Sequence, residues 1–215
     1  ISKVEKTYLY VLNQIKKFVK KNQLSSNPIN SKLKNLADIY HGNFSLFQSL
    51  PDMWAIDQLH PIAPIQKLNR KPNRNVIIND ITCDSDGVIS KFVLKNGISD
   101  TLPLHDIKNN DEYYLGVFFI GAYQETLGDL HNLFGDTNIS TVKLEDNGKF
   151  KVIHEQTGDK ISQVLNYVEY SSNEVLKTFT GITEKFYKKN VINSKEKNQL
   201  LKNFKASIDG YTYFE

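Results

Sequence analysis

The sequence predicts an α+β protein in three successive parts, and three observations support this fold class. The chain begins with a segment in which apolar residues recur every three or four positions. Its middle holds short alternating and β-branched runs between turn residues, and its last third returns to helical spacing. No eightfold alternation of strands and helices is visible, so a (β/α)8 barrel is not expected in this chain. We expect a helical part at 1–43, a β-domain at 44–158 and a helical extension at 159–215.

The composition is that of a globular protein with a substantial core. The chain has 215 residues, of which 40% are hydrophobic, and a formal net charge of +3 with lysines spread over the helical segments. Neither a nucleic-acid nor a membrane partner is expected, because there is no concentrated basic patch and no apolar run near the ~20 residues that span a bilayer. The single cysteine excludes an internal disulfide and a cysteine-based zinc site, and a cytoplasmic location is expected. No signal-peptide pattern is visible at the start of the chain. The first residue is Ile1 rather than methionine, so we expect the chain to be a fragment or to follow an unseen segment.

The first forty residues predict a helical hairpin. Residues 2–22 place apolar side chains on one face and lysines mostly on the other. Polar residues and Pro28 interrupt this pattern, and residues 31–40 resume it with Ser31 as a suitable N-cap. The apolar positions of the first helix are Val4, Tyr8, Val11, Leu12, Ile15, Phe18 and Val19.

The β-domain is predicted to begin with an irregular segment. Prolines at 51, 61 and 64 exclude a long helix, and a short strand around residues 60–65 fits better. Residues 75–83 form a near-continuous apolar strand, and the alternating run that follows ends in Asn96-Gly97, a hairpin signal.

The rest of this region contains one long aromatic run. Residues 112–123, EYYLGVFFIGAY, are expected to form a long, buried central strand. A short helix broken by glycines is predicted within residues 124–136, and a hairpin within residues 140–155 around the turn at Asp146, Asn147 and Gly148.

The last third predicts helices and a docked tail. After a short segment at 160–168, amphipathic helices are expected at 173–189 and 195–208. Ser171 with Glu174, and Asn193 with Glu196, have the spacing of capping boxes. The closing residues 209–215, DGYTYFE, are aromatic, and we expect them to pack against the domain.

The stretch DITCDSDG at 80–87 holds the only cysteine and three aspartates. It is not an EF-hand, because Gly87 at the sixth position puts Thr82 at the first and Val93 at the twelfth. A nucleophilic thiolate needs electropositive surroundings, and the aspartates favour the neutral thiol instead. Cys83 is therefore either a proton donor or a buried cysteine packed at a strand end.

Two further features have alternative interpretations. The aspartates could serve turn formation and capping, or they could bind a guanidinium or ammonium group. Tyr123 in GAYQE could present its phenol to a phosphate at the start of a helix, or it could simply pack its ring.

Four segments in order resemble the C-terminal part of bacterial biosynthetic arginine decarboxylases. They are FQSLPDMWAIDQLHPIAPI, DITCDSDG, YYLGVFFIGAYQETLGDLHNLFGDT and the closing GYTYFE, and the match runs from about residue 44 to the end. The resemblance implies the β-domain, sandwich- or barrel-like, of the alanine-racemase-like fold, preceded by a helical insertion. The family's (β/α)8 barrel, with its Schiff-base lysine, would lie outside this chain.

The resemblance also implies an activity. The family uses pyridoxal 5'-phosphate to convert L-arginine to agmatine and CO2 in putrescine and spermidine biosynthesis, in homodimers or higher homo-oligomers with shared active sites. By resemblance, Cys83 is the acid that protonates the substrate α-carbon, Asp84 meets the cationic end of the substrate, and Tyr123 binds the cofactor phosphate. Magnesium is a second cofactor of the family, and no residue of this sequence specifies its site. This chain alone is expected to be inactive.

Some residues and alternatives stay open at this stage. Asp52, Asp57, His131 and Asn132 are distinctive but have no assigned role, and His60 stands where an aromatic such as Phe is expected and is interpreted as peripheral. A related decarboxylase acting on ornithine or lysine is one alternative. A regulatory or interaction module derived from such an enzyme is another.

Overall fold

A computed structural model describes residues 3–21, 37–108 and 111–214. The chain divides into two compact units, the first made of residues 1–40, 59–78 and 89–118 and the second of residues 41–58, 79–88 and 119–215. Small sheets and helices make up the described residues, which contain no closed barrel, so the predicted α+β class is confirmed.

The first unit begins with helix α1 (Lys3–Lys21), as the apolar spacing predicts. The prediction of a second helix over residues 31–40 is wrong for the residues that the structure describes. Residues 31–36 lie outside the described part of the chain, and Asp38–His41 form strand β1 with alternating burial. β1 is the neighbour of β3 in a sheet, and the Tyr40 hydroxyl donates a hydrogen bond to the carbonyl oxygen of His105 over 2.9 Å. Tertiary pairing therefore overrides the helical pattern there.

The main sheet has the order β1-β3-β4, and β7 also pairs with β3. Strands β3 (Arg74–Asn79) and β7 (Leu102–Leu104) are antiparallel, with Val76 opposite Leu102. β4 (Val88–Ile89) completes the sheet. The buried apolar side chains of this unit are Ile62, Val76, Ile78, Ile89, Phe92, Leu102 and Leu104.

Two antiparallel strand pairs accompany this sheet. The expected hairpin is formed by β5 (Phe92–Leu94) and β6 (Gly97–Ser99), where Gly97 has φ +114° and so needs the freedom of glycine. The short strand expected around 60–65 is β2 (Ile62–Pro64), paired with β8 (Leu115–Val117). The neighbouring His60 is buried, with 7% of its surface exposed.

The long central strand expected over residues 112–123 is wrong. Only the three residues of β8 are strand, and none of them is fully buried. Phe119 has a left-handed backbone with φ +60° and an exposed fraction of 89%, and Phe118, Ile120 and Tyr123 are exposed too. The aromatic and β-branched composition that suggested a core strand therefore belongs to an apolar surface.

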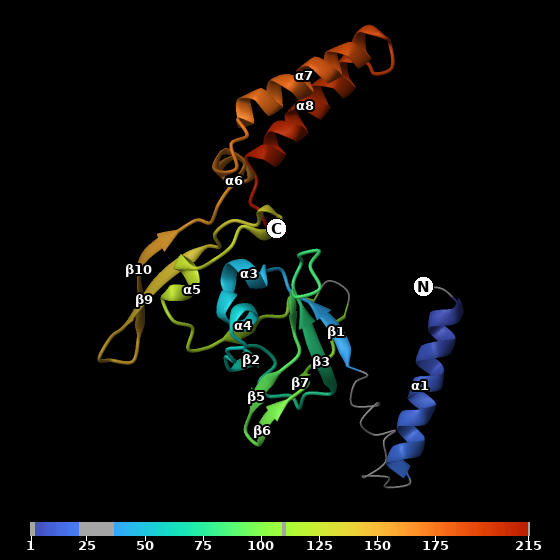
Figure 1. Cartoon of the computed structure of the whole chain (residues 1–215), viewed down its shortest axis with the longest axis vertical. Helices are drawn as coiled ribbons and strands as arrows, with labels where there is room; N and C mark the ends of the chain where they lie inside the picture. Colours follow the sequence, from blue (N-terminus) through green and yellow to red (C-terminus); the bar gives the residue numbers. More distant parts are fainter. Residues whose placement is uncertain (1–2, 22–36, 109–110, 215) are drawn as a thin grey trace. The chain divides into compact units, whose positions relative to one another are not determined.

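The second unit contains the short helices α3 (Leu46–Ser49), α4 (Pro51–Ala55) and α5 (Tyr123–Thr126) and the 3-10 turn η1 (His131–Leu133). Strands β9 (Ile139–Leu144) and β10 (Phe150–Gln156) form the predicted two-stranded ribbon (Figure 1). The predicted glycine-broken helix corresponds to α5 and η1.

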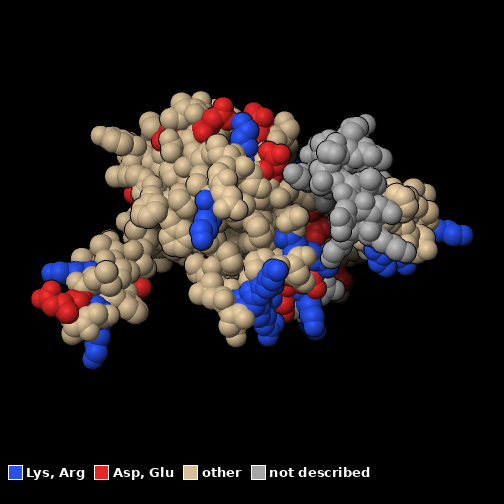
Figure 2. All heavy atoms as spheres, turned by 90° about the horizontal axis from the view of Figure 1, so that it is seen from below, with Lys and Arg blue, Asp and Glu red and all other residues tan. Residues whose placement is uncertain are grey.

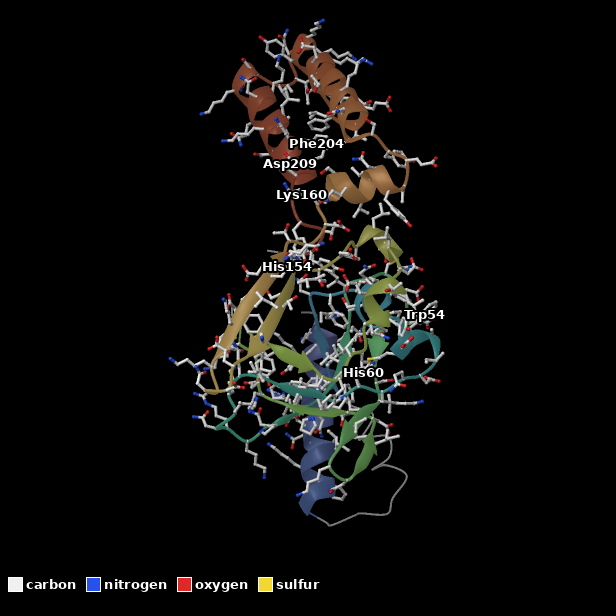
Figure 3. The ribbon with its side chains drawn as sticks, turned by 90° about the vertical axis from the view of Figure 1, so that its left-hand side faces the viewer. Trp54, His60, His154, Lys160, Phe204 and Asp209 are labelled. Carbon is white, nitrogen blue, oxygen red and sulfur yellow. The ribbon has the colours of Figure 1, made fainter. Side chains whose placement is uncertain are left out.

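The C-terminal helices are α6 (Ile161–Tyr167), α7 (Ser172–Lys188) and α8 (Ser194–Ile208). The Ser171 side chain accepts from the amide of Glu174, and Asn193 and Glu196 form a full capping box, as predicted. Helices α7 and α8 lie side by side (Figure 1), and Phe204, seen between them in Figure 3, stacks on Phe179 with ring centroids 3.9 Å apart.

The aromatic tail is docked, as predicted. Tyr213 is buried with 6% of its surface exposed and stacks with Phe134, with 5.1 Å between the ring centroids. The amide group of the Asn43 side chain exchanges two hydrogen bonds with the backbone of Phe214.

The surface of the described residues carries both signs of charge. On the face shown in Figure 2, lysine and arginine side chains are interspersed with acidic ones. Among the helices that the structure describes, none combines the length and the apolar character needed to cross a membrane.

Candidate functional site

The turn at residues 80–87 is built around the buried carboxylate of Asp80. β3 ends here because Asp80 turns its polar groups inward: its amide donates to the carbonyl of Gly87 over 2.8 Å, and its side chain is only 4% exposed. Oδ1 accepts from both the amide (2.9 Å) and the hydroxyl (2.7 Å) of Thr82, and Oδ2 accepts from the amide of Leu46 over 2.8 Å. Asp80 is therefore a structural residue that shapes the turn.

Gly87 closes this turn because no side chain fits there. A Cβ at this position would lie 2.6 Å from Cγ of Asp80 and 2.8 Å from the hydroxyl oxygen of Thr82. The turn therefore requires glycine at this position because there is no room for a side chain. It does not require the backbone angles that only glycine adopts.

Cys83 lies exposed on this turn, so a cysteine packed into the core is excluded. Its amide donates to Oδ1 of Asn132 over 3.1 Å, and Nδ2 of Asn132 donates to its sulfur over 3.3 Å. The three aspartates make their hydrogen bonds with other groups of the turn and its surroundings. The polar partner of the thiol is thus the amide of Asn132 on η1.

Asp84 lies beside Cys83 and faces the same 3-10 turn. Its Oδ1 accepts from the amide of Asp86 over 2.9 Å, and its Oδ2 lies 3.7 Å from Nε2 of His131. That nitrogen is enclosed and has no hydrogen-bond partner among the described residues. The ring of Phe47 packs against the His131 ring with 4.5 Å between centroids, which fixes the imidazole next to the carboxylate.

Helix α4 connects this turn to α5, where Tyr123 lies. Trp54, labelled in Figure 3, donates from its indole nitrogen to Oδ2 of Asp86 over 3.4 Å. Asp52 exchanges two hydrogen bonds with the buried side chain of Gln124: its amide donates to Oε1 over 3.2 Å, and its carboxylate accepts from Nε2. Asp52 therefore has a structural role in tying α4 to α5.

Tyr123 is the first residue of α5 and has 75% of its surface exposed. Its ring is not packed, which removes the packing interpretation. In the described part of the chain, no hydrogen bond joins it to Cys83 or Asp84, so the structure brings Cys83 and Asp84 together and presents Tyr123 separately.

Sequence reasoning noticed His131 and Asn132 but gave them no role. The turn that carries them stands out only in the structure, where Asn132 has φ +57° and Leu133 has φ +61°. No spacing rule in the sequence predicts two consecutive left-handed residues. Asp57 also has a left-handed backbone, and the described structure assigns it no partner that explains its side chain.

Within the described residues, no group of three or more His, Cys, Asp or Glu side chains could hold a metal ion. The three aspartates of the turn are close in sequence, but their carboxylates are directed to different hydrogen-bond partners. The turn therefore offers no donor set for magnesium.

Comparison with known proteins gives a consistent result. The family model for the arginine decarboxylase C-terminal helical extension matches residues 161–214. The biosynthetic arginine decarboxylase of Phocaeicola vulgatus is 43% identical over 214 residues, which cover 100% of this chain and 34% of that protein. That of Bacteroides thetaiotaomicron is 41% identical, again over 100% of this chain and 34% of the relative. This chain thus spans about a third of the length of these curated relatives.

A solved structure agrees with the sequence matches. The crystal structure of the biosynthetic arginine decarboxylase from Campylobacter jejuni has a TM-score of 0.70 and 33% identity to this chain, over 82% of this chain and 29% of that one. The family model, the sequence relatives and the solved structure all match this chain to arginine decarboxylases. The chain therefore belongs to the biosynthetic arginine decarboxylase family and corresponds to its C-terminal portion.

Proposed function

We propose that this chain contributes the proton donor and a substrate-binding carboxylate to a pyridoxal-phosphate-dependent arginine decarboxylase. The reaction is the conversion of L-arginine to agmatine and CO2, with a role in polyamine biosynthesis. The observation that carries the proposal is the turn at 80–87, which presents Cys83 and Asp84 side by side. The buried carboxylate of Asp80 in the same turn already accepts hydrogen bonds from backbone amides and a hydroxyl group.

Cys83 is suited to deliver a proton to the substrate α-carbon. When CO2 leaves, the bond between Cα and the carboxyl carbon breaks and its electron pair stays with the Cα side. The new Cα–H bond needs a proton from a positioned acid. A cysteine thiol is ordinarily protonated at neutral pH and can still release its proton, whereas an exposed carboxyl group is already ionised. The exposed position of Cys83 leaves its sulfur accessible to a substrate.

Asp84 is suited to bind the cationic end of the substrate. A carboxylate accepts two parallel hydrogen bonds from a guanidinium group, which gives orientation as well as attraction. One oxygen of Asp84 is oriented by the amide of Asp86, and the other faces His131 at 3.7 Å. Because Cys83 and Asp84 are adjacent on one rigid turn, binding of the guanidinium would help to place Cα near the thiol.

The residues of this chain fit one part of a cofactor site. The exposed phenol of Tyr123 can donate a hydrogen bond to a phosphate, and the space around the preceding Gly121 is open. Pyridoxal phosphate, when bound, would withdraw the electrons left at Cα by the loss of CO2. No lysine of this chain is assigned to bind its aldehyde, and that residue is expected in the barrel of the longer protein. The described residues do not fit magnesium, and no step involves it.

The proposed active site is shared between subunits of a homo-oligomer. The exposed apolar side chains of Phe118, Phe119 and Ile120 support this proposal, because apolar surface of this kind is typical of contacts with another domain or subunit. Only Gly121 and Ala122 separate them from Tyr123, so the contact would also cover the proposed cofactor-binding residue.

The substrate assignment is tested in the longer protein that contains this chain. Turnover is measured with L-arginine, L-ornithine and L-lysine, for the native protein and for Asp84→Asn. We expect arginine to be preferred, and we expect Asp84→Asn to raise KM for arginine by about tenfold because it loses a charged hydrogen-bond acceptor. Asp146→Asn, in the exposed turn between β9 and β10, is the control. Preference for ornithine or lysine, or an unchanged KM in Asp84→Asn, would contradict the assignment.

A further inference from the structure

We infer that Asn132 is a positioning residue that aims the thiol of Cys83 and stabilises the negative charge left on its sulfur after proton transfer. This inference rests on the proposed function of Cys83 as the proton donor. Its structural basis is a pair of hydrogen bonds: Oδ1 of Asn132 accepts from the amide of Cys83 over 3.1 Å, and Nδ2 donates to the sulfur over 3.3 Å.

The orientation of the Asn132 amide group is fixed by chemistry. A backbone amide can only donate, so the side-chain oxygen must face the amide of Cys83. The NH2 group must then face the sulfur. The sulfur is consequently an acceptor from Asn132, and the S–H proton is directed elsewhere. Asn132 leaves that proton available for delivery.

The same bond matters after the proton has moved. The S–H bond breaks, the proton forms the new bond to Cα, and the electron pair stays on the sulfur as a thiolate. A hydrogen bond from a fixed N–H group to an atom that gains negative charge becomes stronger as the charge develops. Asn132 would therefore stabilise the product side of proton transfer, and the thiolate then takes a proton from water before the next turnover.

The backbone around Asn132 is held in place on several sides. Asn132 has φ +57°, a conformation that asparagine tolerates better than most residues. The preceding His131 is packed on Phe47, with 4.5 Å between ring centroids. Three residues further on, Gly135 is bonded to the tail through its amide, which donates to Oγ1 of Thr212 over 3.1 Å. Both ends of the turn that carries Asn132 are thus fixed.

Asn132→Asp is the variant that isolates the bond to sulfur. Aspartate tolerates the same backbone angle and keeps an oxygen acceptor for the amide of Cys83, but it replaces the NH2 donor by a carboxylate oxygen. Asn147→Asp is the matched control. Asn147 also accepts from a backbone amide, that of Lys149 at 2.8 Å, and also donates to a side chain, that of Glu145 at 3.3 Å, in the exposed turn between β9 and β10.

The first readout is the chemistry of the thiol itself, measured in the longer protein without added substrate. The rate at which iodoacetamide alkylates Cys83 is followed by peptide mass spectrometry at a pH of about 7.5, where a small fraction of an ordinary thiol is ionised. We expect Asn132→Asp to slow alkylation by about tenfold, because the thiolate loses a donor and gains a negative neighbour. We expect Asn147→Asp to leave the rate unchanged. A loosened turn would expose the thiol more and speed alkylation, so an equal or faster rate in Asn132→Asp would overturn the inference.

The second readout is turnover of L-arginine, with Asn132→Gly added as a variant that keeps the backbone angle and removes both hydrogen bonds. We expect kcat to fall by about tenfold in Asn132→Asp and Asn132→Gly, with KM nearly unchanged. Cys83→Ala separates the two proposals. If Cys83→Ala leaves the reaction unaltered, the proposed role of Cys83 fails; if Cys83→Ala impairs it while both Asn132 variants behave like the native protein, only the role of Asn132 fails.

Discussion

The phenol of Tyr213 donates a hydrogen bond to the carbonyl oxygen of Gly135 over 2.9 Å, and the amide of Gly135 donates to Oγ1 of Thr212 over 3.1 Å. Two consecutive tail residues therefore hold both backbone groups of one glycine. Gly135 follows the turn that carries His131 and Asn132, so the C-terminal tail braces the loop that faces Cys83 and Asp84.

Tyr213→Phe should lower the free energy of unfolding by about 1–2 kcal/mol, because the buried carbonyl of Gly135 loses its partner. Urea unfolding followed by circular dichroism measures the change. Tyr167→Phe is the control, since Tyr167 is exposed and should tolerate the loss of its hydroxyl. Equal effects of the two variants would show that the bond to Gly135 contributes nothing measurable.

The same tyrosine predicts a loss of stability in alkali. Burial, and after it the nearby Tyr211 and Asp136, raise the pKa of Tyr213 well above its ordinary value of about 10. Below a pH of about 10 its contribution is complete. As the pH rises further, the unfolded state loses this proton while the folded state retains it, so stability falls by up to ~1.4 kcal/mol per pH unit. The free energy of unfolding between about pH 9 and 11.5 should fall less steeply in Tyr213→Phe than in the native protein, and parallel curves would contradict the prediction.

Gly87→Ala should destabilise the protein by about 1–3 kcal/mol, because the new methyl group would collide with the Asp80 carboxylate and the Thr82 hydroxyl. Gly181→Ala serves as the opposite control. Gly181 lies inside α7, and a methyl group added there would meet no atom within 4 Å apart from its own stretch of helix backbone, so alanine should stabilise this helix by about 0.5–1 kcal/mol. Thermal unfolding of both variants measures these changes in stability. If Gly87→Ala left the stability unchanged, the turn would have relaxed around Asp80 and the prediction would be wrong.

The elements that were predicted correctly are those whose signals are local. The caps at Ser171 and Asn193, the hairpin turn at Asn96-Gly97 and the periodicity of α7 and α8 each depend on residues a few positions apart. The prediction of a buried strand at 112–123 is wrong because apolar composition shows that side chains favour burial but not what they pack against. Phe118, Phe119, Ile120 and Tyr123 are exposed in this chain, and a sequence pattern cannot distinguish apolar residues of a domain core from apolar residues of a surface.

The candidate site was predictable only in part for a related reason. Cys83 and Asp84 lie in one short motif, so their adjacency follows from the sequence. The approach of Asn132 to Cys83 joins positions 49 residues apart through a left-handed turn, and no local rule specifies it. Asp80 shows that membership of the motif does not imply a place in the site. It shares the acidic motif with Asp84, yet its oxygens accept hydrogen bonds from backbone amides of Leu46 and Thr82.

Tyr123→Phe in the longer protein should weaken the affinity for pyridoxal phosphate by about tenfold, because the ring remains and the phenolic donor to the phosphate is lost. Cofactor titration followed by absorbance measures the dissociation constant, with Tyr167→Phe as the control on an exposed tyrosine far from α5 in sequence. Since the ring of Tyr123 is exposed in this chain, folding should be unaffected. An unaltered dissociation constant would contradict the phosphate-binding role.

The role of Cys83 as the acid is tested most directly by the products that Cys83→Ala forms from L-arginine in the longer protein. Agmatine and the aldehyde that results when the proton reaches the cofactor instead of Cα are quantified by mass spectrometry over the same time course. We predict that agmatine formation falls by about tenfold or more and that the aldehyde makes up a larger fraction of the product. Native rates of agmatine formation with no additional aldehyde would contradict this role.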